Sequence, residues 1–219
     1  MRWIWSLVGM GVAIVTVPGA IAAERPAAGN TDQPIPGVVQ PYCLDRGQIS
    51  LNRCAANWAR LTERLHAAIK AEIDSGLLAD QSDQLAGIEA DWIVFRDAHC
   101  SLVAQQVEGG SLYPMVFNQC IARITNERIA ALQAWGVVPD DWDGAETALQ
   151  TAYAEFETAY ASPDPLLELT QTHWETYRVN HCQFEAARQD AVLGDEQRCL
   201  ARLAVERTAQ LRWLTGFGW

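Results

Sequence analysis

Apolar residues recur every three or four positions in six separate stretches of the chain, which is the period of an amphipathic α-helix. No stretch shows the sustained alternation typical of a strand. In the first half of the sequence the faces predicted to be buried comprise Trp58, Leu61, Leu65, Ala68 and Glu72; Leu85, Ile88, Trp92, Phe95 and His99; and Phe117, Ile121, Ile124, Arg128, Ala131 and Trp135. In the second half they comprise Leu149, Tyr153, Phe156 and Tyr160; Leu167, Thr170, Trp174, Tyr177, His181 and Phe184; and Leu200, Leu203, Arg207 and Leu214. The sequence therefore predicts an all-α protein.

Polar, Gly and Pro residues mark the expected breaks between these helices. Residues 80–83 are predicted to separate the first two helices, and the Gly-rich segment 108–114 precedes the third. A connector, residues 137–144, leads to the second set, in which residues 162–165 separate the first two helices. The chain thus reads as three helices, a connector and three more helices.

The two sets of helices repeat one another. The phrase at residues 92–100 returns at 174–182 with Trp, Arg, His and Cys in matching places, and residues 120–132 are echoed at 199–211. We therefore predict an internal duplication that gives two tandem, disulfide-braced three-helix units, residues 42–136 and a degenerate second copy at 145–219. The shared residues that we expect to serve the structure are Trp92, Arg96, Arg123, Arg128, Trp174, Arg178, Arg202 and Arg207.

Six cysteines, an even number, favour disulfides in an exported chain. The second copy has only Cys182 and Cys199, so these two are expected to bond to each other. By analogy Cys100 bonds to Cys120, which leaves Cys43 with Cys54. Crossed pairing among the four cysteines of the first copy is the alternative, because Cys54 is expected at the same end of the bundle.

The N-terminal residues indicate export. Arg2, an apolar run that is too short to span a bilayer, and small residues near position 22 predict a signal peptide at 1–22. A flexible Pro-rich leader is predicted at 23–41. We expect a periplasmic or secreted protein with no membrane attachment after cleavage.

The charge balance restricts the partners. The formal net charge is −11, and it becomes −12 when Arg2 is removed with the signal. Such a surface repels nucleic acid and attracts cationic proteins.

Arg128 and Arg207 occupy apolar faces where leucine is expected. A buried guanidinium needs a carboxylate, and the candidates are Glu72, Glu127 and Glu206. We favour internal salt bridges that fix the register of the helices over a substrate-binding arginine cluster.

The His-Cys pairs raise the alternative of a zinc site built from His99, Cys100, His181 and Cys182. Adjacent helical residues point about 100° apart, and each sulfur has a cysteine partner nearby, so we favour histidines packed beside disulfides. We expect no metal and no cofactor. No catalytic motif is present in the sequence, and we expect no enzymatic activity. Trp142, in the connector, is a candidate exposed aromatic, although a packing role is favoured.

The first copy resembles the N-terminal domain family of the lysozyme inhibitor LprI. The resemblance rests on Cys43 and Cys54, the phrase Trp92-x-x-Phe95-Arg96-Asp97-x-x-Cys100, the glycine loop, and Cys120-x-x-Arg123-x-x-x-x-Arg128. It implies an exported envelope domain that inhibits a basic lysozyme or binds another cationic envelope protein. The alternative is a non-inhibitory adaptor module. The candidate partner-binding loop comprises Glu108, Gly109, Gly110, Ser111 and Tyr113.

Overall fold

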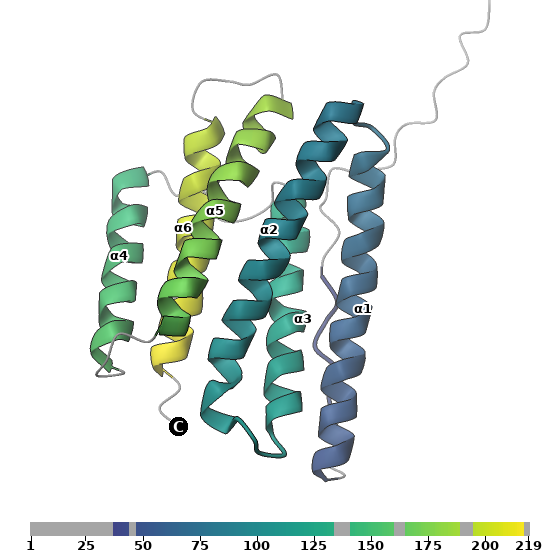
Figure 1. The fold of residues 1–219 in the computed structure, drawn as a ribbon, viewed down its shortest axis with the longest axis vertical. Helices are drawn as coiled ribbons and strands as arrows, with labels where there is room; N and C mark the ends of the chain where they lie inside the picture. The colour runs from purple at the N-terminus through teal and green to yellow at the C-terminus, as the bar shows by residue number, and fades with distance from the viewer. Residues whose placement is uncertain (1–36, 44–46, 134–140, 160–164, 189–194, 217–219) are drawn as a thin grey trace, which may run out of the picture. The chain divides into compact units, whose positions relative to one another are not determined.

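Six α-helices and one 3-10 turn make up the part of the chain that the structure describes (Figure 1). The structure is a computed structural model, and it describes residues 37–43, 47–133, 141–159, 165–188 and 195–216. The first three helices are α1 (Gln48–Asp74), α2 (Ala79–Ala104) and α3 (Tyr113–Leu132), with the 3-10 turn η1 (Gln105–Val107) between the last two. They are followed by α4 (Trp142–Ala159), α5 (Pro165–Arg188) and α6 (Asp195–Gly216). These residues contain no strand, so the all-α prediction is confirmed.

The helices form two groups of three with the same internal contacts. In the first half, α1 and α2 both pack on α3, and in the second half, α4 and α5 both pack on α6. The halves meet where α2 packs against α5, side by side in the middle of Figure 1. Asp91 contacts Asn180, whereas Phe95, one turn later in α2, stacks on Tyr177, which is earlier in α5, so the two helices run in opposite directions. This pairing of equivalent helices agrees with an internal duplication.

The buried face of α1 differs from the predicted one. It runs through Ala55, Trp58, Thr62, His66 and Ile69. Leu61, Ala68 and Glu72, which were expected there, are exposed, Leu61 by 47%. The prediction was wrong because two buried positions are polar: Thr62 donates a hydrogen bond to the Ala59 carbonyl oxygen at 2.7 Å, and His66 pairs with a carboxylate of α2. Hydrophobicity alone does not mark such positions.

Helices α2 and α4 begin earlier in the chain than the predicted breaks 80–83 and 137–144 allowed. Residues 80–83 do not separate α1 from α2 but form the start of α2, where Gln81 accepts a hydrogen bond from the Leu78 backbone N–H at 3.0 Å. Asp80 lies in the first turn, where the helix dipole favours a negative charge. Trp142 is not a connector residue but the first residue of α4, half-buried against the core. The remainder of the connector, together with Trp135 and Tyr160, lies outside the described residues.

The end of the predicted leader is held against the helices. The Val38 N–H donates to Asn126 Oδ1, and its carbonyl oxygen accepts from Asn126 Nδ2 and Trp58 Nε1, all at 2.9 Å. A side chain at Gly37 would place its Cβ 2.4 Å from Asn126 Oδ1, so the close approach requires glycine. The expected signal peptide and the start of the leader lie outside the described residues. No helix within the described residues has the length and apolar character needed to cross a membrane.

Three disulfides brace the fold in the pairing that the sequence favoured. Cys43 is bonded to Cys54, Cys100 to Cys120 and Cys182 to Cys199, and no cysteine is free. The latter two bonds link equivalent helices, α2 to α3 and α5 to α6, with the same Cα–Cα separation of 5.4 Å. Crossed pairing in the first half is ruled out by these bonds. Closing loops of this length stabilises a fold by about 3 kcal/mol each in the chain-entropy model.

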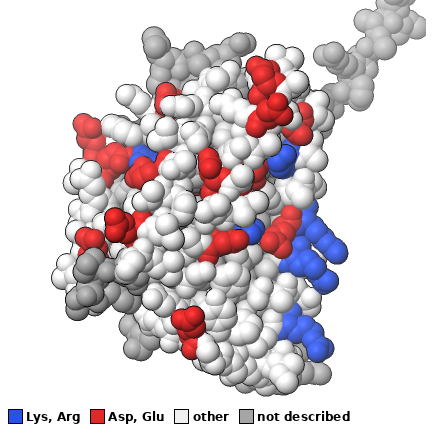
Figure 2. Space-filling model, in the orientation of Figure 1, with Lys and Arg blue, Asp and Glu red and all other residues white. Residues whose placement is uncertain are grey.

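Charge is distributed unevenly between the halves. Residues 137–219 carry fourteen acidic and six basic side chains, whereas residues 42–136 carry eleven and eight. No Lys or Arg occurs between Arg128 and Arg178, so α4 and the first half of α5 bear negative charge alone. Figure 2 shows acidic side chains over the part of this face where α4 and α5 lie, and basic side chains along the edge where α1 lies. The exposed basic residues of α1 are Arg53, Arg60 and Arg64.

Candidate functional site

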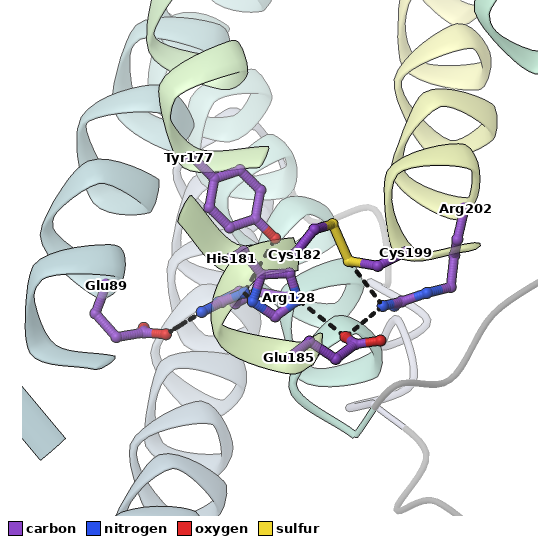
Figure 3. A network of polar contacts seen from close by, with 8 residues as sticks. All are labelled: Glu89, Arg128, Tyr177, His181, Cys182, Glu185, Cys199 and Arg202. Atoms are coloured by element: carbon purple, nitrogen blue, oxygen red, sulfur yellow. Dashed lines mark hydrogen bonds and ion pairs between the residues drawn. A yellow bond between two sulfur atoms is a disulfide. The ribbon is translucent and has the colours of Figure 1, made fainter. Parts of the chain in front are cut away.

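A buried polar network occupies the seam between the halves (Figure 3). At its centre is Arg128 of α3, which is 1% exposed. Its Nε and Nη2 atoms donate to Glu89 Oε1 of α2 at 3.0 and 2.5 Å, and Glu89 Oε2 lies 2.9 Å from His66 Nε2. Its Nη1 atom crosses to the other half, donating to the Tyr177 hydroxyl at 3.0 Å and contacting His181 Nδ1 at 3.1 Å. One guanidinium therefore joins three helices of both halves.

Arg207 of α6 is the repeat counterpart of Arg128, and it contacts the first half as Arg128 contacts the second. Its Nη1 atom contacts His99 Nδ1 of the first half at 3.0 Å and donates to Gln210 Oε1 at 2.9 Å. Its Nε atom donates to Gln171 Oε1 at 3.1 Å. Each half thus places an arginine against the histidine of the other half.

The two arginines differ in their acidic partner. Gln171 is the repeat counterpart of Glu89, so Arg128 is neutralised by a carboxylate and Arg207 meets an amide instead. The Nη2 atom of Arg207 is buried and has no hydrogen-bond partner among the described residues. The first-half arginine therefore provides the stronger link.

Arg123 and Arg202 form a second pair of equivalent arginines, and here the second-half residue has the closer carboxylate. Arg202 Nη2 lies 2.6 Å from Glu185 Oε2, whereas its counterpart Arg123 reaches only Glu127, at 3.4 Å, and lies over the Trp213 ring. The repeat counterpart of Glu185 is Val103, a buried apolar residue. Each half therefore has a carboxylate at one of these two equivalent positions, Glu89 in the first half and Glu185 in the second.

The protonation of this network follows from its burial. Burial, reinforced by the Arg128 charge, lowers the pKa of His181 to about 4, so the ring is neutral at pH 7. With Nδ1 accepting from Arg128, the proton is on Nε2, which faces Glu185 Oε2 at 3.4 Å. Burial would raise the pKa of Glu89, but the charges of Arg128 and His66 lower it to about 2.

The remaining motif residues tie the second helix of each half to the first. Arg96 lies over the Trp92 ring and pairs with Asp97 and with Glu63 of α1. Arg178 lies over the Trp174 and Trp142 rings, pairs with Glu146 of α4 and donates to the Leu200 carbonyl oxygen at 2.9 Å. In each half a Trp-Arg unit therefore fixes one helix against another.

The four residues considered for zinc do not converge. His99 and His181 contact arginines of opposite halves, and both sulfurs are in disulfides. His181, Glu185 and Cys199 are close enough to suggest a metal site, but Cys199 is oxidised and cannot supply a thiolate ligand. The contacts of the described residues in this network are therefore hydrogen bonds, ion pairs and disulfides among themselves.

The candidate partner-binding loop is exposed and only partly available. Glu108, Gly109, Gly110 and Ser111 are exposed, and Gly109 has a φ of 74°, which favours glycine. Asn52 donates to the Ser111 carbonyl oxygen at 3.1 Å and so ties the loop to α1. Tyr113 belongs to α3 instead, with its ring stacked on Phe117. The exposed part of the loop is residues 108–111, of which Ser111 is held to α1.

The main partners of the arginines differ from the carboxylates predicted from the sequence. Glu72 is exposed, and Glu89, Gln171 and Glu185 were not considered. A signal was available for Glu89, because it lies one helical turn before Trp92 on the buried stripe of α2.

Comparison with known proteins agrees with this architecture. The family model described as "Lysozyme inhibitor LprI" matches residues 43–132 and 137–211, and each segment spans one three-helix half. An uncharacterized protein of Rhizobium meliloti (strain 1021) is 31% identical over 121 residues, which cover 49% of this chain and 84% of the relative. No solved structure gives a significant match.

We predict that Glu89→Gln lowers the free energy of unfolding by about 3 kcal/mol, because Arg128 and His66 both lose their buried carboxylate. The reverse change in the second half, Gln171→Glu, places a carboxylate beside Arg207 and serves as the matched control. It is expected to leave stability unchanged or to raise it by up to about 1 kcal/mol. Urea unfolding followed by circular dichroism measures both, and equal losses from the two substitutions would contradict the assignment of Arg128 as the stronger link.

The neutral state of His181 predicts a pH dependence of stability. A folded pKa of about 4 against an unfolded value of 6.5 means that the unfolded chain binds the extra proton, so this contribution is complete above pH 6.5 and is lost as the pH falls toward 4. Between pH 7 and pH 5 the loss is about 2 kcal/mol. His181→Gln keeps an acceptor and a donor but cannot titrate, so it lacks this loss.

The measurement is the difference in unfolding free energy between the unaltered protein and His181→Gln at the two pH values. Burial and the Glu127 charge raise the pKa of Glu206 to about 8, which gives a slope of opposite sign in both proteins and cancels in the difference. A difference independent of pH would show that His181 does not titrate on unfolding as described.

Proposed function

The chain belongs to the lysozyme inhibitor LprI family, and from that premise we propose that it binds a strongly basic lysozyme outside the cytoplasm and inhibits it by protein-protein contact. The three disulfides fit an oxidising, extracytoplasmic compartment. The family is named for inhibition and not for catalysis, which fits the expectation of a protein without enzymatic activity.

The observation that carries the proposal is the concentration of negative charge on the second half. Residues 137–219 have a formal charge of −8, against −3 for residues 42–136. On α4, Asp143, Glu155 and Glu157 are exposed, and no basic residue of that helix neutralises them. We therefore place the main contact with the cationic partner on α4 and the adjoining part of α5.

Such a surface acts mainly on the rate of encounter. Complementary charge steers a partner toward one face, and the effect weakens as salt shortens the screening length to about 10 Å at 0.1 M. The exposed arginines of α1 repel a basic partner, so the charge asymmetry also orients the encounter.

The loop at residues 108–111 is proposed as the second contact. It is exposed, it lies beyond the ends of the helices, and it has no equivalent of the same length in the second half, where the interval between the paired cysteines is 17 residues instead of 20. A short glycine-rich segment adapts to a narrow cleft more readily than a helix does. In this arrangement the acidic residues of α4 attract the basic lysozyme, and the loop blocks the cleft of that enzyme.

Neutralising α4 is expected to weaken inhibition. The triple variant Asp143→Asn/Glu155→Gln/Glu157→Gln should raise the concentration needed for half-inhibition by roughly five- to tenfold at low salt, since exposed pairs contribute about 0.2–1 kcal/mol each. The assay follows clearing of a cell-wall suspension by a basic lysozyme across a salt series. The matched control, Glu72→Gln/Asp80→Asn/Asp83→Asn, changes the net charge equally on α1 and α2, and a similar loss from both would refute the placement on α4. A cell-wall suspension incubated with this protein and no lysozyme tests whether the protein itself degrades the cell wall.

Shortening the loop is expected to separate binding from inhibition. Deleting residues 109–111 gives the first half the loop length of the second half. Binding to immobilised lysozyme should persist because α4 is untouched, while inhibition of clearing falls. Undiminished inhibition by the deletion variant would remove the loop from the contact. Binding without inhibition by the unaltered protein would instead identify an adaptor module.

A further inference from the structure

A cavity of about 310 Å³ lies where α1, α3 and α6 meet, away from the acidic face of α4. Trp58, Met115, Val116 and Trp213 provide apolar walls, and Gln40, Gln119 and Arg123 provide the polar groups. The volume equals that of about ten water molecules at roughly 30 Å³ each, and it falls at the small end of ligand-binding sites. Mostly apolar walls with one charged group are typical of sites for small amphipathic ligands.

The charged group in this cavity has an unused donor. Arg123 Nη1 reaches Glu127 Oε1 only at 3.4 Å, while the other carboxylate oxygen of Glu127 accepts from Gln210 at 2.7 Å. The Nη2 atom of Arg123 is buried and has no hydrogen-bond partner among the described residues. This atom faces the protein interior, whereas the guanidinium as a whole lines the cavity and has its carboxylate partner only at 3.4 Å, which favours an additional acceptor.

The second half shows which acceptor such an arginine takes. The counterpart Arg202 donates from the same atom, Nη2, to the Glu185 carboxylate at 2.6 Å. The first half has Val103 at the position of Glu185, so the carboxylate is missing and apolar surface stands in its place. The repeat therefore supplies an internal reference for a carboxylate ligand.

We propose that this cavity binds a small carboxylate with an apolar body. The carboxylate pairs with the Arg123 guanidinium, and the apolar body lies between Trp58, Met115 and Trp213. Charge-assisted hydrogen bonds to a guanidinium are the strong ones, and apolar walls hold a hydrocarbon chain or an aliphatic side chain. This proposal is independent of the proposed binding of lysozyme. A free fatty acid of medium length and the C-terminal residue of a peptide share this chemistry.

Calorimetric titration of the purified mature protein with octanoate tests the proposal. Ligands of this size reach dissociation constants of about 1 mM or below. Octanoate should bind at least about tenfold more tightly than octan-1-ol, which has the same chain without the charge. A short peptide ending in Leu, compared with its amidated form, distinguishes a chain end from a free acid. Tryptophan fluorescence should change on binding, because Trp58 and Trp213 line the cavity.

Two variants locate the site. Arg123→Gln should raise the dissociation constant of octanoate at least about tenfold and abolish its advantage over octan-1-ol. Val103→Glu restores the internal carboxylate and should also prevent binding. Arg60→Gln, on the exposed face of α1, removes an equal charge and should bind as the unaltered protein does.

Equal binding of octanoate and octan-1-ol, retained binding by Arg123→Gln, or no heat with any of these probes would overturn the proposal. The comparison of octanoate with octan-1-ol uses the unaltered protein, so it decides the question even where a variant fails to fold.

Discussion

The pairing of Arg128 with Glu89 is the contact on which the arrangement of the halves depends. A guanidinium that is 1% exposed requires a carboxylate, and Glu89 supplies it from α2 at 2.5 Å. The same guanidinium then reaches Tyr177 and His181 on α5, so its position also fixes how α2 lies against α5. Sliding the halves past one another would separate Arg128 Nη1 from Tyr177 and His181 and leave a buried donor without a partner. Apolar packing alone tolerates such shifts more readily, because it has no directional requirement.

The neutral histidines make this junction specific. His99 and His181 occupy equivalent places, and each receives a hydrogen bond from the arginine of the opposite half. Between them Phe95 stacks on Tyr177 with ring planes 3° apart. The residues of the repeated phrase Trp-x-x-aromatic-Arg-x-x-His-Cys thus make different kinds of contact. Its Trp and Arg hold helices within a half, its aromatic and His residues hold the halves together, and its Cys braces the helix pair that carries them.

The helices and the disulfides could be predicted from the sequence because both are governed by local spacing. Apolar periodicity marked all six helices, and the two cysteines of the second half favoured, by analogy, the pairing that the first half has. The partners of the arginines could not be predicted, because any of the scattered carboxylates satisfies the charge. Glu72 met that requirement and is exposed, whereas Glu89 is chosen only when α2 and α3 are packed. The buried face of α1 was placed wrongly for a related reason, since Thr62 and His66 are polar and their burial depends on contacts across helices.

The repeated motif residues are therefore distinct from the surface that we propose as the contact with a partner. Arg128, Arg178, Arg202 and Arg207 are buried and hydrogen-bonded within the fold, so they present little surface to a partner. The exposed carboxylates of α4 and the loop at 108–111 lie outside these constraints, and substitutions there leave the buried network intact. Arg123 is the exception, because Val103 stands at the position equivalent to Glu185 and the Arg123 guanidinium lines a cavity. In the second half Glu185 pairs with the equivalent Arg202, so the ligand site that we propose is specific to the first half.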